Sequence, residues 1–379
     1  MIYLDNSATT FPKPFAVREA CALAVRTSAN PGRSGHEPSL RAAGEIFRAR
    51  QAAAELFNAP SENSVVFTHN CTAALNTVIK GLLKSGDHVI VSELEHNAVM
   101  RPIESMKARG VSCTAVKVYP ADNDRTVDSF RQAITIKTRL IVCAQASNVW
   151  GIRLPVERLA ALAHEYGLLI AVDAAQSAGV VPIDIKDSGI DYLCVAGHKG
   201  LYGPMSAGML IVGSDRIPEP LTEGGTGSYS LSFMQPAELP DRLESGTPDV
   251  SGIAGLRAGM DFVRDKGIER IAAHEFMLIR RLYRGLRAVK GIELYLPEPE
   301  PRHFVPILSF NFTNIDSETA AGQLGRYGIA VRAGLHCSPA AHRAFGTQEK
   351  GAVRISPSVF TTAKDIDTAL YAIKRTASS

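Results

Sequence analysis

The sequence predicts an α/β protein that has a large domain with a mainly parallel seven-stranded sheet flanked by helices, and a smaller C-terminal α+β domain. Between about residue 60 and residue 212, short β-branched runs alternate with amphipathic stretches of helical period. This alternation is typical of parallel strands joined by helices. A Gly-, Pro- and Ser-rich stretch at 217–248 then interrupts the alternation, and a long helical pattern follows it.

The individual elements follow from these patterns. Short apolar runs predict strands at residues 64–67, 88–92, 112–118, 140–144, 168–173, 192–196 and 207–212. Helical periodicity predicts helices at residues 72–83 and 156–166, and one long pattern rich in Arg and Ala at 251–288. The C-terminal part is predicted to hold strands at 307–311, 329–332 and 353–356, a helix at 317–327 and a closing helix after Thr362.

The length of 379 residues exceeds what one small core organises, so two domains are expected. We predict a large domain at 15–255 and a small domain at 256–379, joined by the N-terminal segment 1–14. The boundary between the two falls inside the long helical pattern.

The composition excludes several classes of protein. Hydrophobic residues make up 45% and charged residues 21% of the chain, with a net charge of +3, as in soluble proteins. Lys and Arg are scattered among acids, so no nucleic-acid partner is predicted. The chain has no signal-like leader and no apolar run of roughly 18 residues, so we expect a cytoplasmic protein without a membrane partner. Six cysteines without paired spacing favour free thiols over disulfides.

Two polar residues at predicted strand ends carry the first chemical signal. Asp173 ends an apolar strand, where its carboxylate could pair with a cationic ring nitrogen or merely cap the following turn. Lys199 lies 26 positions later in a turn rich in glycine. A lone lysine there is usually just exposed, but an amine on a strand end that faces a ligand suits imine formation. The pair favours a cofactor bound through Lys199.

A strand-to-helix junction at residues 68–74 offers a phosphate site. The free backbone N–H groups and the Thr72 hydroxyl could receive a phosphate at the start of the helix, although capping alone explains Thr72 equally well. The glycine cluster at 224–227 is not followed by a helical pattern, so a dinucleotide site is rejected.

Two further residues have both a chemical and a structural interpretation. His96 follows a strand, where its ring could stack on a planar cofactor, move a proton or act in helix capping. Arg354 interrupts an apolar strand, and a buried arginine usually pairs with an anion. That anion could be a substrate carboxylate or an acid of the chain such as Asp365.

Cys337 lies in a Gly- and Pro-containing loop after a predicted strand, with arginine and histidine neighbours that favour the thiolate. A buried structural cysteine fits this polar loop poorly. A metal site with His336 and His342 is a further alternative, but no second cysteine lies at zinc-ligand spacing. We therefore predict a nucleophile and no metal.

Taken together, these segments resemble the cysteine desulfurase and selenocysteine lyase family, in the class V aminotransferase group of fold-type I pyridoxal-phosphate enzymes. The resemblance covers nearly the whole chain. It rests on the order and spacing of residues 3–10, 28–31, 147–148, 197–199 and 332–337.

The resemblance implies pyridoxal 5'-phosphate as the cofactor and assigns a role to each matching position. Lys199 would carry the cofactor as a Schiff base, with Asp173 at the ring nitrogen, Gln176 at the ring hydroxyl and His96 stacked on the ring. The phosphate would be held by Thr72, Ala73 and His198, and by Gly246 and Thr247 of the opposite subunit of a homodimer. The substrate would be bound by Asn148, Arg354 and Arg332.

The implied activity is the conversion of L-cysteine to L-alanine, in which Lys199 is the base and Cys337 receives the sulfur as a persulfide that a partner protein could collect. The alternatives are a selenocysteine lyase, a cysteine sulfinate desulfinase and a sulfur carrier without catalysis. The chain departs from the family at Cys71 and Ala196, where hydroxyl residues are frequent, and at Leu335, where a histidine is frequent.

Overall fold

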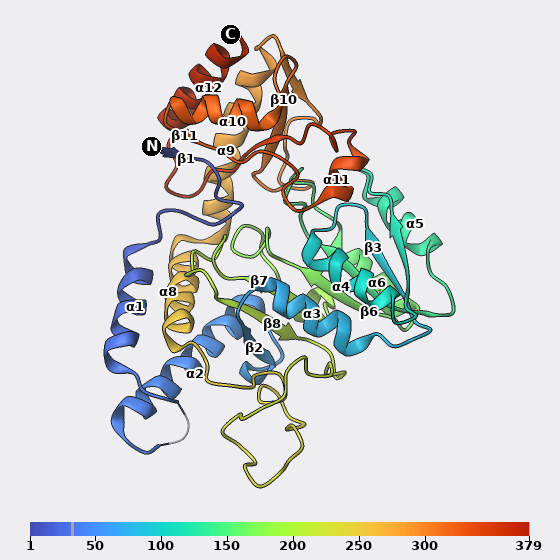
Figure 1. Cartoon of the computed structure of the whole chain (residues 1–379), viewed down its shortest axis with the longest axis vertical. Coiled ribbons are helices and arrows are strands. Elements are labelled where there is room, and N and C mark those ends of the chain that lie inside the picture. Colours follow the sequence, from blue (N-terminus) through green and yellow to red (C-terminus); the bar gives the residue numbers. More distant parts are fainter. Residues whose placement is uncertain (32–33, 379) are drawn as a thin grey trace.

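The computed structural model describes residues 1–31 and 34–378 and shows a broad part built around the sheet below a smaller part that holds the C-terminal helices (Figure 1). The strands are β1 (Ile2–Tyr3), β2 (Val65–Thr68), β3 (His88–Ser92), β4 (Ser112–Val116), β5 (Thr138–Ala144), β6 (Leu169–Asp173), β7 (Tyr192–Ala196), β8 (Gly208–Val212), β9 (Ile292–Leu294), β10 (Leu308–Phe312), β11 (Ile329–Ala330) and β12 (Val353–Ile355). The helices are α1 (Phe15–Thr27), α2 (Glu37–Phe57), α3 (Cys71–Leu82), α4 (Asn97–Lys107), α5 (Asn123–Gln132), α6 (Val156–Glu165), α7 (Ile185–Ser188), α8 (Val250–Lys266), α9 (Ile268–Arg287), α10 (Ser317–Arg326), α11 (Pro339–Ala344) and α12 (Ala363–Ala377), with a 3₁₀ turn at Glu62–Ser64.

The central sheet has seven strands in the order β2-β8-β7-β6-β5-β3-β4, and only β8 runs antiparallel to its neighbours. The predicted fold class is therefore confirmed. Strands β3 and β7 have the predicted bounds, and the other five differ by one or two residues at an end.

Both faces of this sheet are covered, which explains why its strands are nearly continuous runs of Val, Ile and Leu. Successive residues of β5 face opposite cores. Ile141 packs in the core that contains Leu159 of α6, whereas Val142 packs in the core that contains Leu75 of α3 and Ile103 of α4.

The parallel arrangement brings the carboxyl ends of four strands to one edge, where ligands bind in such sheets. His96 follows β3, Asn148 follows β5, Asp173 ends β6 and Lys199 follows β7. Residues up to about a hundred positions apart in the sequence thus lie along one edge.

The prediction of one helical pattern over 251–288 is wrong at Gly267, which separates α8 from α9 and has φ 83°. Glycine adopts this left-handed conformation without the cost that a β-carbon brings. Helix α8 packs on α1 and α2, and α9 packs on α12. The division into domains at 15–255 and 256–379 remains a prediction.

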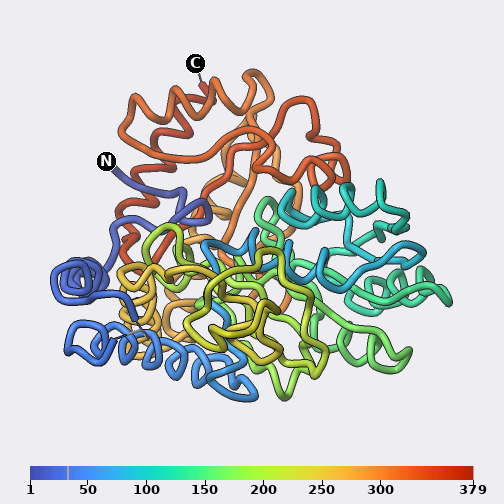
Figure 2. Tube along the Cα trace, turned by 60° about the horizontal axis from the view of Figure 1, so that its bottom comes forward, coloured from blue at the N-terminus to red at the C-terminus, as the bar shows by residue number. Residues whose placement is uncertain are grey.

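The N-terminal segment belongs to the upper part, although it precedes the whole lower part in the sequence. Strand β1 pairs in parallel with β11, and Leu4 is fully buried in a core with Phe310, Ile355 and Ile373. Beside it, β10 pairs antiparallel with β9 and β12. The strand predicted at 329–332 is shorter in the structure and ends at Ala330. Figure 2 shows the blue N-terminal chain passing between the red C-terminal part and the rest of the molecule.

In Figure 1, segment 217–249 forms a long loop that projects from the bottom of the molecule. All six cysteines are free, and Cys71, Cys143 and Cys194 are buried. In the described residues, no helix is both long and apolar enough to cross a membrane.

Candidate active site

Lys199 lies in the turn that follows β7 and is partly buried. Burial lowers the pKa of its amine, and the nearby Asp173 carboxylate partly opposes that effect. The Nζ atom has no hydrogen-bond partner among the described residues. An amine with a lowered pKa and no partner is suited to attack a carbonyl group.

Asp173, at the end of β6, is 6% exposed. Its Oδ1 accepts a hydrogen bond from the Ala175 N–H at 2.9 Å and one from the Cys71 thiol at 3.4 Å. The interpretation of Asp173 as a cap of the following turn is therefore correct for one oxygen. Oδ2 has no hydrogen-bond partner within residues 1–31 and 34–378, so it remains available to a ligand.

His96 caps the N-terminus of α4, where its Nδ1 accepts from the Ala98 N–H at 3.0 Å. The capping interpretation is therefore correct. Because Nδ1 is an acceptor, the neutral ring carries its proton on Nε2. Burial lowers the pKa of His96, which favours this neutral form, while Asp173 opposes the shift. Nearby, the Gln176 side-chain amide donates to the Ser7 carbonyl at 3.0 Å.

The start of α3 is capped by Asn70, whose Oδ1 accepts from the Ala73 N–H at 2.9 Å. The capping interpretation of Thr72 is therefore wrong, because Asn70 satisfies that need and Thr72 is exposed on the first turn. In the described chain, the N–H groups of Cys71 and Thr72 have no acceptor, as expected of a helix N-terminus that can bind an anion.

His198 adds a further unsatisfied group, because its buried Nδ1 has no hydrogen-bond partner among the described residues. Burial lowers its pKa to about 4, and the positive charges of Lys199 and Lys13 act in the same direction. Its carbonyl accepts from Lys13 Nζ at 2.7 Å and from both Thr9 and Thr10. The N-terminal segment therefore holds the residue next to Lys199 in place.

Cys337 lies on the loop between β11 and α11, with its side chain exposed. Its carbonyl accepts from the N–H of Asn97, the first residue of α4, at 2.8 Å. The preceding His336 and Cys337 itself both have a positive φ, 50° and 57°. Leu335, where the family often has a histidine, is 40% exposed and offers no proton donor.

His336 and His342 do not form the metal site that was one alternative. Their rings bind each other, with 3.2 Å between His336 Nδ1 and His342 Nε2, and His342 Nδ1 lies 2.8 Å from the Thr347 hydroxyl. No group of three or more His, Cys, Asp or Glu side chains lies in a metal-binding arrangement in the described part of the chain.

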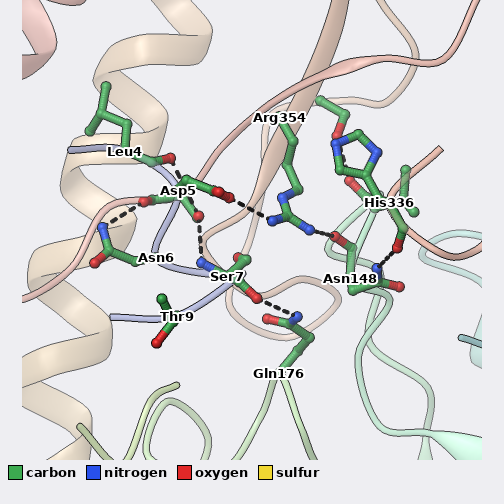
Figure 3. A network of polar contacts seen from close by, with 12 residues as sticks. Leu4, Asp5, Asn6, Ser7, Thr9, Asn148, Gln176, His336 and Arg354 are labelled. Atoms are coloured by element: carbon green, nitrogen blue, oxygen red, sulfur yellow. Dashed lines mark hydrogen bonds and ion pairs between the residues drawn. The ribbon is translucent and has the colours of Figure 1, made fainter. Parts of the chain in front are cut away.

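Arg354 is 2% exposed and carries two strong contacts (Figure 3). Its Nη2 donates to Asp5 Oδ1 and its Nη1 to the Asn148 carbonyl, both at 2.8 Å. The alternative partner Asp365 is wrong, because Asp365 forms the capping box of α12 with Thr362. Arg354 Nε is buried without a partner among the described residues, so this donor is available to a ligand.

Arg332 lies opposite Arg354, and their backbones form an antiparallel bridge. The Arg332 side chain is exposed and forms no hydrogen bond or ion pair in the part of the chain that the structure describes. Burial lowers the pKa of Arg354, and the positive charge of Arg332 adds to this effect. Two guanidinium groups, one on β12 and one on the segment bridged to it, favour an anionic ligand.

The structure brings most of the predicted site residues to one edge of the sheet but leaves two of them apart. Gly246 and Thr247 are exposed on segment 217–249. Gly246 donates its N–H to the Gly225 carbonyl. In the described chain, neither Gly246 nor Thr247 forms a hydrogen bond with any of the other predicted cofactor-binding residues. Ala196 closes β7 and is buried.

Sequence reasoning missed four residues that support the site: Asp5, Ser7, Thr10 and Ser338. The first three belong to the N-terminal motif at residues 3–10, whose order was recognised without a role for any of its residues. The signal that could have identified Asp5 was an acid inside this motif. Ser338 had no signal beyond its place next to Cys337.

The comparisons with known proteins identify the family. The family model described as Aminotransferase class-V matches residues 2–369. A probable cysteine desulfurase from Methanothermobacter thermautotrophicus is 34% identical over 375 residues, which cover 96% of this chain and 92% of the relative. A cysteine desulfurase from Klebsiella pneumoniae is 32% identical over 386 residues, which cover 99% of this chain and 93% of the relative.

Solved structures give the same result. The apo structure of a cysteine desulfurase from Thermococcus onnurineus has a TM-score of 0.92 and 29% identity, and the match covers 100% of this chain and 94% of that one. The cysteine desulfurase CsdA from Escherichia coli has a TM-score of 0.89 and 29% identity, with the same two coverages. With the strand-end lysine and aspartate, a match over nearly the whole length and a shared fold, this chain belongs to the class-V aminotransferase family.

Proposed function

We propose that this protein is a cysteine desulfurase that uses pyridoxal 5'-phosphate to convert L-cysteine to L-alanine and receives the sulfur on Cys337. One observation carries the proposal. Within the described chain, one edge of the sheet holds the amine of Lys199, which has no partner, and the carboxylate of Asp173, which has one free oxygen. The loop that contains Cys337 is hydrogen-bonded to the same edge by Asn97 and Asn148.

The residues present fit the cofactor. Asp173 Oδ2 can accept from a ring N–H, and Gln176 lies nearby for the ring hydroxyl. The unsatisfied N–H groups of Cys71 and Thr72 and the orphaned Nδ1 of His198 form a set of donors for a phosphate. We propose that Ala73, whose N–H donates to Asn70 Oδ1, lines this site, and that Gly246 and Thr247 of a second copy close it in a homodimer.

When bound, pyridoxal 5'-phosphate withdraws electrons from the Cα of the amino acid attached to it. The protein then has to handle protons and hold the substrate. Lys199, whose pKa is lowered by burial, is the base that takes the Cα proton. Asp173 supplies a negative charge opposite the ring nitrogen, and the neutral His96 offers a flat surface.

The substrate carboxylate is proposed to bind at Arg354, whose Nε–H is unsatisfied among the described residues. Arg332, whose backbone is bridged to that of Arg354, adds positive charge, and the second amide N–H of Asn148 is available. The Cys337 thiolate then attacks the substrate sulfur. As the new S–S bond forms, the bond from sulfur to Cβ breaks, its electron pair stays on the carbon and is protonated, and alanine leaves.

The exposed side chain of Leu335 favours a second candidate. Without a proton donor at this position, the chemistry near the thiol is less assisted, which suits selenocysteine or cysteine sulfinate, whose bond to Cβ is weaker. A sulfur carrier without catalysis is less well supported, because Lys199, Asp173 and Cys337 are all present.

Cellular context completes the proposal. Six free cysteines fit a reducing compartment, so we propose a cytoplasmic location. The exposed position of Cys337 allows an acceptor protein to collect the sulfur from it.

The experiment that tests the proposal is an absorption spectrum of the purified protein before and after adding L-cysteine, with alanine and sulfide measured in the same tube. A visible band that changes on addition, together with alanine formation, is the expected result. A band without alanine would direct attention to selenocysteine and cysteine sulfinate, to be tested in parallel. The absence of any band would favour the carrier.

A further inference from the structure

We propose that Asn148 and Ser338 form a clamp that sets the position of Cys337 for sulfur capture, so that Asn148 acts through the loop as a positioning residue. The clamp consists of the Asn148 side-chain amide, the His336 carbonyl and the Ser338 hydroxyl. This inference rests on the proposed function, in which Cys337 receives the sulfur.

Both polar atoms of the Asn148 side chain bind the loop, one on each side of Cys337. Its Nδ2 donates to the His336 carbonyl at 2.7 Å, and its Oδ1 accepts from the Ser338 hydroxyl at 2.7 Å. Figure 3 shows the bond from Asn148 to the His336 carbonyl. A side-chain amide that bonds to residues before and after one position fixes the backbone at that position.

The burial pattern shows what the clamp holds. Asn148 is 8% exposed, His336 5% and Ser338 0%, whereas Cys337 between them is exposed. Hydrogen bonds in buried surroundings are stronger and more costly to break than those in water. The Cys337 thiol is therefore exposed to solvent, while the residues on both sides of it are buried.

A third bond holds the loop from the opposite side. The Asn97 N–H donates to the Cys337 carbonyl at 2.8 Å, at the start of the helix that His96 caps. His336 is held again by its ring, which binds His342. Each of the three residues 336–338 thus has its own anchor.

The backbone of this loop needs such anchors. His336 and Cys337 are consecutive non-glycine residues in the left-handed region, with φ of 50° and 57°. This conformation is disfavoured for residues that have a β-carbon, and it persists only where the surrounding contacts impose it. Loss of an anchor should therefore let the loop relax and move the thiol.

The clamp also joins the thiol to the proposed substrate site. Arg354 Nη1 donates to the Asn148 carbonyl, so the guanidinium and the Cys337 loop are held by the main chain and the side chain of one residue. The separation between the carboxylate site and the thiol is then set by Asn148 itself.

The test is Ser338→Ala, which removes the bond to Asn148 Oδ1 and leaves Arg354 and the cofactor residues unchanged. We expect kcat for L-cysteine to fall about 10- to 100-fold, because a small misplacement of a reacting group has this effect. The visible band and KM should stay within about twofold. Turnover of L-selenocysteine, which depends less on the thiol, should fall far less. Alkylation of Cys337 by iodoacetamide should change in rate.

Three more variants sharpen the test. Ser338→Thr keeps the hydroxyl and should restore most of the kcat. Asn148→Asp keeps an acceptor for Ser338 but loses the donor to the His336 carbonyl, and it also loses the N–H proposed for the substrate carboxylate. It is therefore assessed by the alkylation rate of Cys337, which should change as in Ser338→Ala even if Ser338→Ala folds poorly. Ser39→Ala is the matched control, because Ser39 is also 0% exposed and its hydroxyl donates to the Asn30 carbonyl at 2.7 Å.

Unchanged kcat and alkylation in Ser338→Ala would overturn the clamp. A raised KM at constant kcat would also overturn it, because that result would mean a role in substrate binding. An equal fall of kcat for L-cysteine and L-selenocysteine, together with loss of the visible band, would overturn it as well, because that result would mean a general structural role. The alkylation rate does not depend on turnover. It therefore tests the clamp even if the native protein forms no alanine and the proposed function fails.

Discussion

Burial sets the charge of the titratable groups around the site. It lowers the pKa of His336 to about 2 and that of His342 to about 4. The charge of Arg354 adds to the effect on His336. Both rings are therefore neutral near pH 7, and the positive charge at this edge of the molecule is carried by the arginines. An anionic substrate thus meets guanidinium groups rather than imidazolium ions.

The proposed nucleophile can be tested by Cys337→Ala. We expect the visible band of the bound cofactor to persist, because Cys337 is not one of the proposed cofactor-binding residues. The rate of alanine formation from L-cysteine should fall by about a thousandfold or more. Alanine measured over time checks this. Cys21→Ala, at a half-buried thiol away from the site, is the control. A native rate in Cys337→Ala would show that the nucleophile has been assigned wrongly.

Arg354→Lys separates substrate binding from the ion pair with Asp5. Lysine keeps the positive charge but has a single ammonium group, which cannot reproduce the planar fork that reaches Asp5, Asn148 and a substrate together. KM for L-cysteine should rise about tenfold or more, with the visible band unchanged. Asp5→Asn provides the comparison. If both variants lowered only the thermal stability and left KM unchanged, the arginine would be structural.

At the scale of elements, we expect the junction between β2 and α3 to matter most for the proposed cofactor binding. Asn70 caps the helix, and this leaves the N–H groups of the first turn directed at a ligand. The Cys71 thiol in the same turn donates to Asp173, so the phosphate end and the ring end of the proposed site are linked by one turn of helix.

Asn70→Ala tests this junction. The loss of an N-cap costs about 1 kcal/mol of the free energy of unfolding, and the frayed turn should bind phosphate less well. We expect weaker binding of pyridoxal 5'-phosphate and little change for pyridoxal, measured by titration of the apoprotein. Asp316→Ala removes a similar cap from α10 and should lower stability without changing cofactor affinity. Equal effects of the two variants on affinity would contradict the proposal.

On the scale of the whole molecule, contacts between distant segments assemble the site. Glu275 on α9 is 4% exposed and accepts from the Tyr202 hydroxyl, which itself accepts from the Val359 N–H. Tyr202 lies in the turn that contains Lys199. A buried carboxyl thus connects α9 to the turn that contains Lys199.

Glu275→Gln should change how stability depends on pH. Burial raises the pKa of Glu275 from its ordinary value of 4.5 to about 8. The folded protein therefore binds an additional proton between these values, and its free energy of unfolding falls as the pH rises from 4.5 to 8. The variant lacks this loss, so its stability relative to the native protein should rise over this range, by at most about 1.4 kcal/mol for each pH unit.

Urea unfolding at pH values near the two ends of this range measures the difference. Glu95, another buried carboxyl whose pKa is raised to about 8, is present in both proteins and cancels. The same stability difference at both pH values would show that Glu275 is ionised in the folded protein.

By itself, the sequence determined the strands, the order of the chemical residues and the family. Short apolar runs and strand-end polar residues are local signals, and the central strands are nearly continuous apolar runs because both faces of the sheet are covered. Lys199, Asp173 and Cys337 could be identified because each follows or ends such a strand.

Only the tertiary structure decided which residues meet. The pairing of Arg354 with Asp5, 349 positions away, could not be read from a local pattern, and the nearer acid Asp365 proved to be a helix cap. The bonds of Asn148 to the Cys337 loop, about 190 positions away, were hidden for the same reason. Local sequence specifies the periodicity and the caps of an element, whereas contacts between elements depend on how buried polar groups are satisfied once the whole chain has packed.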